Sequence, residues 1–309
     1  MLPLLPAVWS NKRRNRNRPP LPQEPVISQP SPIDLSDLSR ITAVQPRAVG
    51  TGRLSVLADS AGKTRLKDLR QSGSTKLVFP HSRSQDIEVI LVNTAGGITG
   101  GDQFDLDISL QPGAQLTLTT QAAERAYRAQ PNETGQVTSR LCVQAGAALK
   151  WLPQELILFD RCALNRRLDI TLQPGADLLL VEPVVFGRTA MGETLRDVMF
   201  RDRITITRAG DPLYLDGMEL IGDATAHLAR PSIANGAAAM ASVVMVNAGA
   251  SNHLEAVRAL LPETAGASML AEDVLVIRQL APDSFELRRA LIPILELLSH
   301  TALPKSWRL

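Results

Sequence analysis

The heptapeptide "LQPGAQL" (110–116) decides the fold, because close copies of it recur as "VQAGAAL" (143–149) and "LQPGADL" (172–178). Each copy reads apolar residue, Gln, Pro or Ala, Gly, Ala, a variable residue and Leu, and the glycines lie 33 and 29 residues apart. Glycine adopts the positive φ of a tight turn, and proline fits the first corner of such a turn. A weaker copy, "TRAGDPL" (207–213), follows 35 residues later. The chain therefore carries similar turns at nearly regular intervals.

The segments beside these turns have the alternating pattern of β-strands with one apolar face. Examples are "DLDISL" (105–110), "AQLTLTT" (114–120) and "RLDITL" (167–172). Strand, turn and strand repeated on this scale indicate stacked supersecondary units. We therefore expect a mostly β fold with a stacked, helical, solenoid-like architecture. A set of ordinary hairpins that share turn chemistry is the alternative.

Two amphipathic helices are expected near the C-terminus, at "HLEAVRALL" (253–261) and "SFELRRALIPILELLSH" (284–300). Pro293 is expected to kink the second helix. Each helix follows a strand-like apolar run, which predicts an α+β part from about residue 240 to residue 309. The predicted β domain as a whole spans residues 41–309.

The first 40 residues differ in composition from the rest of the chain. They carry six basic and three acidic side chains and eight prolines, with no hydrophobic periodicity. Such a composition predicts a disordered tail, whose arginines either contact a partner or simply lie in solvent. The remaining chain is close to neutral, so it lacks the excess positive charge that binding to a nucleic-acid backbone requires.

The bulk composition indicates a cytoplasmic protein without a membrane segment. The chain has two cysteines in 309 residues, which is typical of a reducing compartment. No apolar run reaches the ~18 residues that span a bilayer. The apolar start precedes the basic run "NKRRNRNR" (11–18), which is the reverse of the order in a secretory signal.

The segment "LVNTAGGITGGD" (91–102) resembles a phosphate-binding loop but lacks its essential features. A Walker loop continues with Lys and Ser or Thr, whereas Asp102 follows the last glycine here. A dinucleotide-binding loop opens a helix, whereas strand-like alternation follows here. The glycines instead indicate a close backbone approach that aims Asp102 at a particular place. In the plainer interpretation, Asp102 caps its own turn. The glycines of this motif are Gly96, Gly97, Gly100 and Gly101.

Several motifs in order resemble the urease accessory protein D family, also called UreD or UreH. They are "NTAGGITGGD" (93–102), "LTTQAAERAYR" (118–128), "LKWLPQELILF" (149–159), "FGRTAMGE" (186–193) and the terminal "LPKSWRL" (303–309). The likeness covers roughly residues 41–309. It implies a non-enzymatic scaffold that binds apo-urease, accessory protein F and the GTPase accessory protein G. It also implies delivery of nickel, which is in transit rather than a tightly bound cofactor, and leaves room for a homodimer within the complex.

The resemblance also assigns roles to individual acidic residues. Asp102 and Glu193 are associated in the family with an internal nickel route, where they act as transient ligands, and Glu155 is a further candidate for that path. Carboxylate oxygens suit such a cation if they bind it weakly enough to release it. The alternatives are a turn aspartate and an ion pair between Glu193 and Arg188.

The same motifs supply candidates for a partner surface or for the mouth of the route: Arg125, Tyr127, Arg128 and Arg188. Their structural alternative is pairing with nearby acidic residues. Where many relatives carry Cys and His, this chain has Ile87 and Glu88. The histidines are scattered without metal-binding spacing, so no tight preformed metal site is expected. They are His81, His227, His253 and His300.

Two other classes of protein fit parts of this sequence. Asp102, Glu155 and Glu193 are carboxylates that a glycan-processing enzyme on a β-helical fold could pair. The aromatic content of 4% argues against this enzyme, because sugar platforms usually need tryptophan and tyrosine. A β-solenoid adhesion module is the second class, and the lack of a recognisable secretory signal argues against it.

Overall fold

The computed structural model describes residues 45–80 and 86–308, and the described residues from Pro46 onward form one compact unit. The tail predicted for residues 1–40 lies outside the described residues, as does His81. In the described part of the chain, no helix has both the length and the apolarity that crossing a membrane requires.

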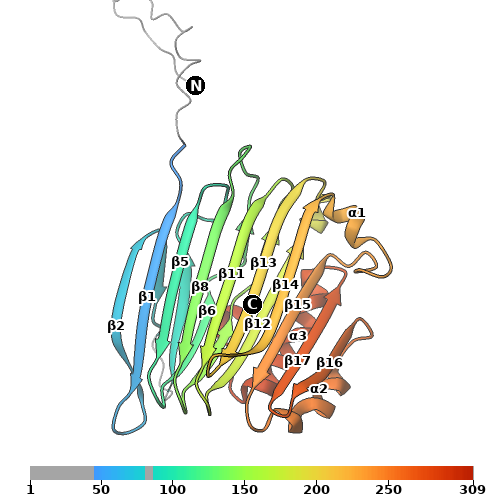
Figure 1. The fold of residues 1–309 in the computed structure, drawn as a ribbon. Helices are drawn as coiled ribbons and strands as arrows, with labels where there is room; N and C mark the ends of the chain where they lie inside the picture. Colours follow the sequence, from blue (N-terminus) through green and yellow to red (C-terminus); the bar gives the residue numbers. More distant parts are fainter. Residues whose placement is uncertain (1–44, 81–85, 309) are drawn as a thin grey trace, which may run out of the picture. The chain divides into compact units, whose positions relative to one another are not determined.

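The unit is built from two sheets, and Figure 1 shows the strands of the first running side by side. In spatial order the first sheet contains β14 (Asp211–Gly222), β13 (Val198–Arg208), β11 (Ala163–Leu172), β8 (Gly135–Val143), β5 (Gln103–Leu110), β1 (Val49–Ala58) and β2 (Thr64–Gly73). The second contains β16 (Ala265–Ala271), β17 (Val274–Ala281), β15 (Ala239–Val246), β12 (Asp177–Phe186), β9 (Ala148–Leu152), β6 (Gln115–Thr120), β4 (Ile87–Asn93) and β3 (Thr75–Val78). The short strand β10 (Leu156–Leu158) pairs with β12 and with β7 (Glu124–Ala126).

The central strands are parallel within each sheet, and the chain alternates between the sheets. β5, β8, β11 and β13 pair in parallel in the first sheet, and β6, β9 and β12 do so in the second. The connections β5–β6, β8–β9 and β11–β12 each carry the chain from the first sheet to the second. This arrangement confirms the predicted stacked, solenoid-like fold.

The repeated Gly-Ala turns make these connections and stack on one another. Gly113, Gly146 and Gly175 have φ values of 73°, 69° and 76°, which glycine adopts without steric cost. The Gly146 amide donates to the Gly175 carbonyl at 3.0 Å. The weaker copy differs: Gly210, with φ 93°, closes an antiparallel hairpin between β13 and β14 inside one sheet. Of the four similar turns, only the one at Gly210 is an ordinary hairpin turn, and the other three connect the two sheets.

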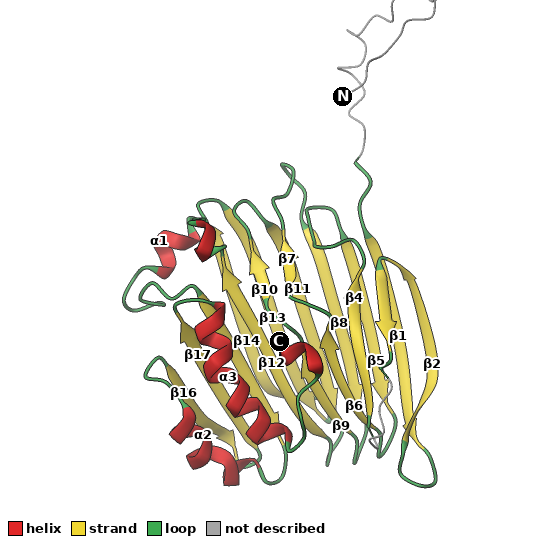
Figure 2. Cartoon of the chain, turned by 180° about the vertical axis from the view of Figure 1, so that it is seen from behind, coloured by secondary structure: helices red, strands yellow, loops and turns green. Residues whose placement is uncertain are grey.

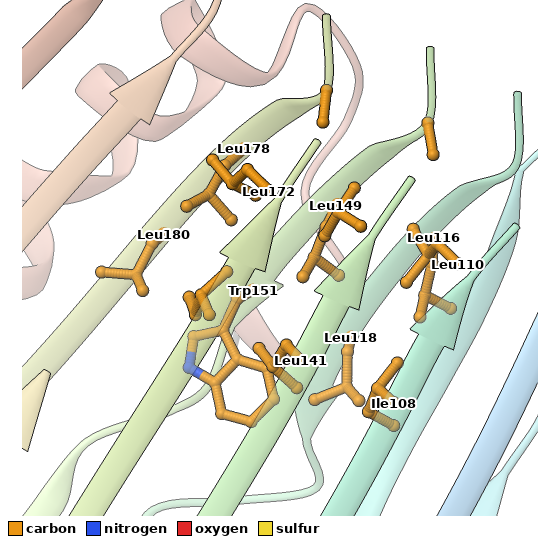
Figure 3. Close-up of a cluster of buried hydrophobic side chains, with 14 of the residues drawn as sticks. Ile108, Leu110, Leu116, Leu118, Leu141, Leu149, Trp151, Leu172, Leu178 and Leu180 are labelled. Atoms are coloured by element: carbon orange, nitrogen blue, oxygen red, sulfur yellow. The ribbon is translucent and has the colours of Figure 1, made fainter. Parts of the chain in front are cut away.

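Leucines on both sides of the turns fill the space between the sheets. Figure 3 shows Leu110, Leu116, Leu172 and Leu178 in this core, with Trp151 beneath them. All are buried, and each buried leucine contributes about 1.5–3 kcal/mol relative to an exposed one.

The helices α2 and α3 cover the outer face of the second sheet at its C-terminal end, whereas α1 lies beyond the ends of the strands (Figure 2). They are α1 (Ala224–Leu228), α2 (Leu254–Leu260) and α3 (Ser284–Ser299), with short 3-10 turns η2 (Thr189–Met191), η3 (Ala250–His253) and η4 (Lys305–Trp307). The two predicted helices thus correspond to α2 and α3, which confirms them. The Asp283 carboxylate caps α3 by accepting from the Glu286 amide. Pro293 lies inside α3, and the kink expected there stays a prediction.

Candidate functional site

The glycine-rich loop between β4 and β5 lies along β7. The Ile98 amide donates to the Arg125 carbonyl, and the Tyr127 amide donates to the Ile98 carbonyl, both at 2.7 Å. A Cβ atom on Gly97 would lie 2.2 Å from the Tyr127 ring, and one on Gly100 would lie 2.7 Å from Glu133 Cβ. These glycines therefore let the loop backbone approach its neighbours more closely than any side chain allows.

Asp102 is buried at the end of this loop, with 4% of its surface exposed. Its Oδ1 accepts from the Ala48 amide and its Oδ2 accepts from the Thr99 amide, each at 2.8 Å. The carboxylate therefore ties the loop to the segment that enters β1. These contacts are those of an aspartate that caps its own turn, which was the alternative to a role in a nickel route. A metal ion bound at Asp102 would have to compete with the two amides for the carboxylate oxygens.

Glu193 forms an ion pair with Arg188. The Arg188 Nε and backbone amide both donate to Glu193 Oε2 at 2.9 Å, and the Asp160 amide donates to Oε1 at 3.2 Å. The hydrogen bond from the Arg188 side chain is the largest cause that lowers the pKa of Glu193. The ion pair with Arg188, which was the alternative to a nickel-route role for Glu193, is therefore present in the structure.

Glu155 is buried in a third place, under α3 and the C-terminal segment. Arg288 Nη1 donates to Glu155 Oε1 at 3.0 Å, and Arg288 Nη2 donates to the Trp307 carbonyl at 3.0 Å. The buried Trp307 indole in turn donates to the Leu152 carbonyl at 2.9 Å. Among the contacts of the described residues, none joins two of the three carboxylates Asp102, Glu155 and Glu193.

Aromatic and arginine side chains gather over the glycine loop. Tyr127, 37% exposed, packs edge-on against Phe159 at a ring-centroid distance of 4.9 Å. The Arg188 guanidinium lies over the ring of the same Phe159, 4.4 Å from its centroid. We call the aromatic–arginine surface the set Arg125, Tyr127, Arg128, Phe159, Arg188 and Met191. Its arginines are exposed, and Met191 is 74% exposed.

A polar layer crosses the interior between the two sheets, and sequence reasoning missed it. Arg166 of β11 stands between Leu164 and Leu168, which belong to two different hydrophobic clusters. Arg166 Nη1 lies 2.7 Å from Glu182 Oε2 on β12, and its Nε donates to Asp202 Oδ1 on β13 at 2.9 Å. The layer separates the two clusters because Arg166, Glu182 and Asp202 come from three strands and meet between them.

The layer continues toward the last strands of both sheets. Asp216 of β14 accepts from Arg278 Nη2 at 2.6 Å, from the Tyr214 hydroxyl at 3.0 Å and from the Ser242 hydroxyl at 3.3 Å. Burial alone would raise the pKa of Asp216, but the contacts with Arg278 outweigh burial and lower it. Buried charges on this scale are tolerated because each carboxylate has a cation or hydrogen-bond donors.

A cavity of about 300 Å³ connects the polar layer with the glycine loop. Asn93, Gly96 and Glu124 line it beside the loop, and Arg166 and Glu182 line it in the layer. A second, water-sized space of about 10 Å³ continues from Glu182 toward Asp202 and Asp216. The interior therefore contains a discontinuous row of spaces between the sheets, which charged side chains line in part.

The cavity includes some of the residues predicted from the sequence and omits others. Arg125 and Gly96 belong to its lining. Among the described residues that line it, Asp102, Glu155 and Glu193 do not occur. Their assignment to a nickel route therefore stays a prediction.

The cavity adds three acidic residues, Asp105, Glu124 and Glu182, and the two glutamates are the more buried of them. Burial is the main cause that raises the pKa of each glutamate, and Glu182 also accepts from the Trp151 indole at 2.6 Å. Glu124 accepts from Asn93 Nδ2 at 3.1 Å. A sequence signal existed for Glu182, which is the one charged residue inside the apolar run "LLLVEPVVF" (178–186).

Comparison with known proteins agrees with the family resemblance of the motifs. A family model described as "UreD urease accessory protein" matches residues 49–308. The urease accessory protein UreD of Roseobacter denitrificans is 51% identical over 265 residues, which cover 86% of this chain and 96% of that protein. The UreD of Ruegeria pomeroyi is 53% identical over 78% of this chain and 94% of its own length. The UreD of Brucella suis is 44% identical over 84% and 94%, respectively. The predicted resemblance is confirmed.

Proposed function

This chain belongs to the UreD family of urease accessory proteins, and from that membership we propose that it is a scaffold for the maturation of urease. The names of its relatives describe accessory proteins, which implies a non-catalytic role. As a scaffold it binds apo-urease together with accessory protein F and the GTPase accessory protein G. The rigid stacked sheets suit this role because they hold loops from distant parts of the chain in fixed positions.

We assign the partner contact to the aromatic–arginine surface. Tyr, Met and Arg are enriched in protein interfaces, and exposed aromatic anchors with neighbouring arginines often dominate binding energy. Tyr127 and Arg188 are already ordered by Phe159, so binding would cost little side-chain entropy. Arg125 of this surface also lines the cavity, which would place a partner beside it.

Nickel would pass through the cavity between the sheets, and this cavity is the observation that carries the proposal. Glu124 offers a carboxylate at the loop end, where its contacts are an Asn93 amide and a backbone amide rather than a cation. Oxygen ligands that are partly satisfied by hydrogen bonds bind a borderline cation weakly enough to release it. Glu182 lies deeper and already faces Arg166, so Glu124 is the more accessible ligand.

Asp102 and Glu193 remain proposed members of the route. Replacing either by Ala should lower the nickel content of urease while the complex with accessory proteins largely still forms, because neither side chain is a member of the aromatic–arginine surface. Glu193→Ala also releases Arg188 of that surface from its ion pair, so its effect on complex formation should be the larger of the two. Both carboxylates hold loops in place through amide contacts, so thermal unfolding must be measured in parallel. If both variants activate urease normally, the assignment of these two residues fails although the family assignment stands.

Deletion of this chain from the producing cell tests the scaffold role directly. Urease should then accumulate as inactive, nickel-poor protein, and expression of the intact chain should restore both activity and nickel content. Co-purification with apo-urease and with accessory proteins F and G checks the partners. Urease that gains full nickel and activity without this chain, at ordinary nickel supply, contradicts the proposal.

A further inference from the structure

Two histidines that are far apart in the sequence form a pair on the surface of the C-terminal part. The ring centroids of His253 and His300 lie 5.0 Å apart, with the ring planes tilted by 51°. His253 is intermediate in exposure and His300 is exposed. The sequence gives no metal-binding spacing for either residue, so the pairing is a product of the fold.

The packing of α2 against α3 brings the two imidazoles together. His253 ends η3 directly before α2, whose Val257 is buried in the same hydrophobic cluster as Leu291 of α3. His300 follows α3 and adopts the left-handed conformation, with φ 52°. Histidine is among the non-glycine residues enriched in that conformation, so this turn positions the ring at little cost.

The distance between the rings suits two ligands of one metal ion. A metal–nitrogen bond of about 2.0–2.1 Å places each imidazole centroid about 3.2 Å from the ion, so rings at neighbouring corners of a tetrahedron or octahedron are about 4.5–5.2 Å apart. The observed 5.0 Å falls within this range. Imidazole is a ligand that nickel, copper and zinc ions share.

The end of α3 also favours a cation at this place, against the opposing charge of Lys150, whose Nζ donates to Thr301 Oγ1 beside His300 at 2.7 Å. The C-terminal end of a helix carries partial negative charge from carbonyl groups without helical partners. α3 has 16 residues and no basic side chain in its last turn, and His300 sits directly at that end. Within residues 45–80 and 86–308, no group of three or more His, Cys, Asp or Glu side chains could hold a metal. Water would therefore complete the coordination, and binding would be reversible.

We propose that His253 and His300 form an open two-imidazole binding site for a divalent first-row transition-metal ion. The site lies outside the cavity between the sheets and does not depend on the function proposed above. Its ligands hold the ion at the surface, where exchange with solvent or with a partner is fast.

Nickel chloride titration of the full chain tests this site, with imidazole signals observed by NMR. Paramagnetic Ni²⁺ should broaden the His253 and His300 signals together, at a lower concentration than it broadens His227, an exposed histidine of α1 that serves as the internal control. The His253→Gln variant should leave His300 broadened only at the concentration that affects His227. His300→Asn, which keeps a residue that tolerates positive φ, should do the same to His253.

The outcomes separate the site from the interior route. If His253 and His300 broaden no earlier than His227, or if each broadens unchanged after the other is replaced, the proposal is wrong. A Glu124→Gln variant should keep the paired broadening. Loss of the pairing in that variant would also overturn the proposal, because it would place the metal elsewhere.

Discussion

Removal of the Arg166 guanidinium is the sharpest test of the polar layer. The guanidinium is mostly buried, with 16% of the side chain exposed, and it contacts Glu182 at 2.7 Å and Asp202 at 2.9 and 2.5 Å. The Arg166→Met variant keeps the apolar stem but leaves two buried carboxylates without their cation. Breaking a buried pair in this way costs about 3–5 kcal/mol in the free energy of unfolding. For a unit of this size that loss corresponds to a fall in Tm of about 10 °C.

The pH dependence of the loss provides a second, independent readout. Burial raises the pKa of Glu182 even with Arg166 beside it, and loss of the guanidinium should raise it further. The folded state then binds a proton that the unfolded chain releases, so stability falls as pH rises from the ordinary carboxyl pKa through the raised one. The difference between wild type and Arg166→Met should therefore be larger at about pH 7 than at about pH 5.

Arg201→Met is the matched control on the neighbouring strand. Arg201 pairs with Glu219 at 2.5 Å, but both side chains are more than half exposed, so the loss should be below about 1 kcal/mol. Urea denaturation followed by circular dichroism measures both variants. If Arg166→Met costs no more than Arg201→Met, or if its deficit grows on acidification, the reasoning about the buried layer is refuted.

Two further substitutions test the glycine loop and the C-terminal segment. Gly97→Ala should cost about 1–3 kcal/mol, because its Cβ would lie 2.2 Å from the Tyr127 ring, whereas Gly266→Ala, with no atom within 4 Å, should be nearly neutral in thermal unfolding. Equal Tm values for the two would argue against the close approach. Trp307→Ala should cost about 3–5 kcal/mol by emptying a fully buried site and freeing the Leu152 carbonyl. A urea midpoint within experimental error of wild type would show that the C-terminal segment is not part of the core.

The repeated turns and the two longer helices could be predicted from the sequence because their signals are local, whereas the short helix α1 was not predicted. Gly113, Gly146 and Gly175 repeat one turn chemistry, and the apolar residues of α3 recur with helical spacing. Gly210 shows the limit of this approach. The sequence of its turn is similar to the other three, but the strand after it pairs within the same sheet. Which strand pairs with which depends on distant segments, and the local sequence carries no information about them.

The polar layer and the histidine pair could not be predicted because they depend on register and on contacts between distant segments. Arg166 and Arg167 are adjacent, and only the strand register decides which of them faces the interior. Asp202 is likewise flanked by arginines in a strand that looks charged on both faces. His253 and His300 meet only through the packing of α2 against α3.

The nickel content of urease matured with the Glu124→Gln variant tests the central claim most directly. Glu124 lines the cavity beside the glycine loop, and glutamine keeps its size while removing the charge that attracts a cation. Glu263→Gln, an exposed carboxylate in the turn before β16, is the control. We predict that Glu124→Gln yields a complex of normal composition but nickel-poor urease, whereas Glu263→Gln yields urease with normal nickel. Equal nickel content in urease matured with the two variants would contradict the proposed interior route.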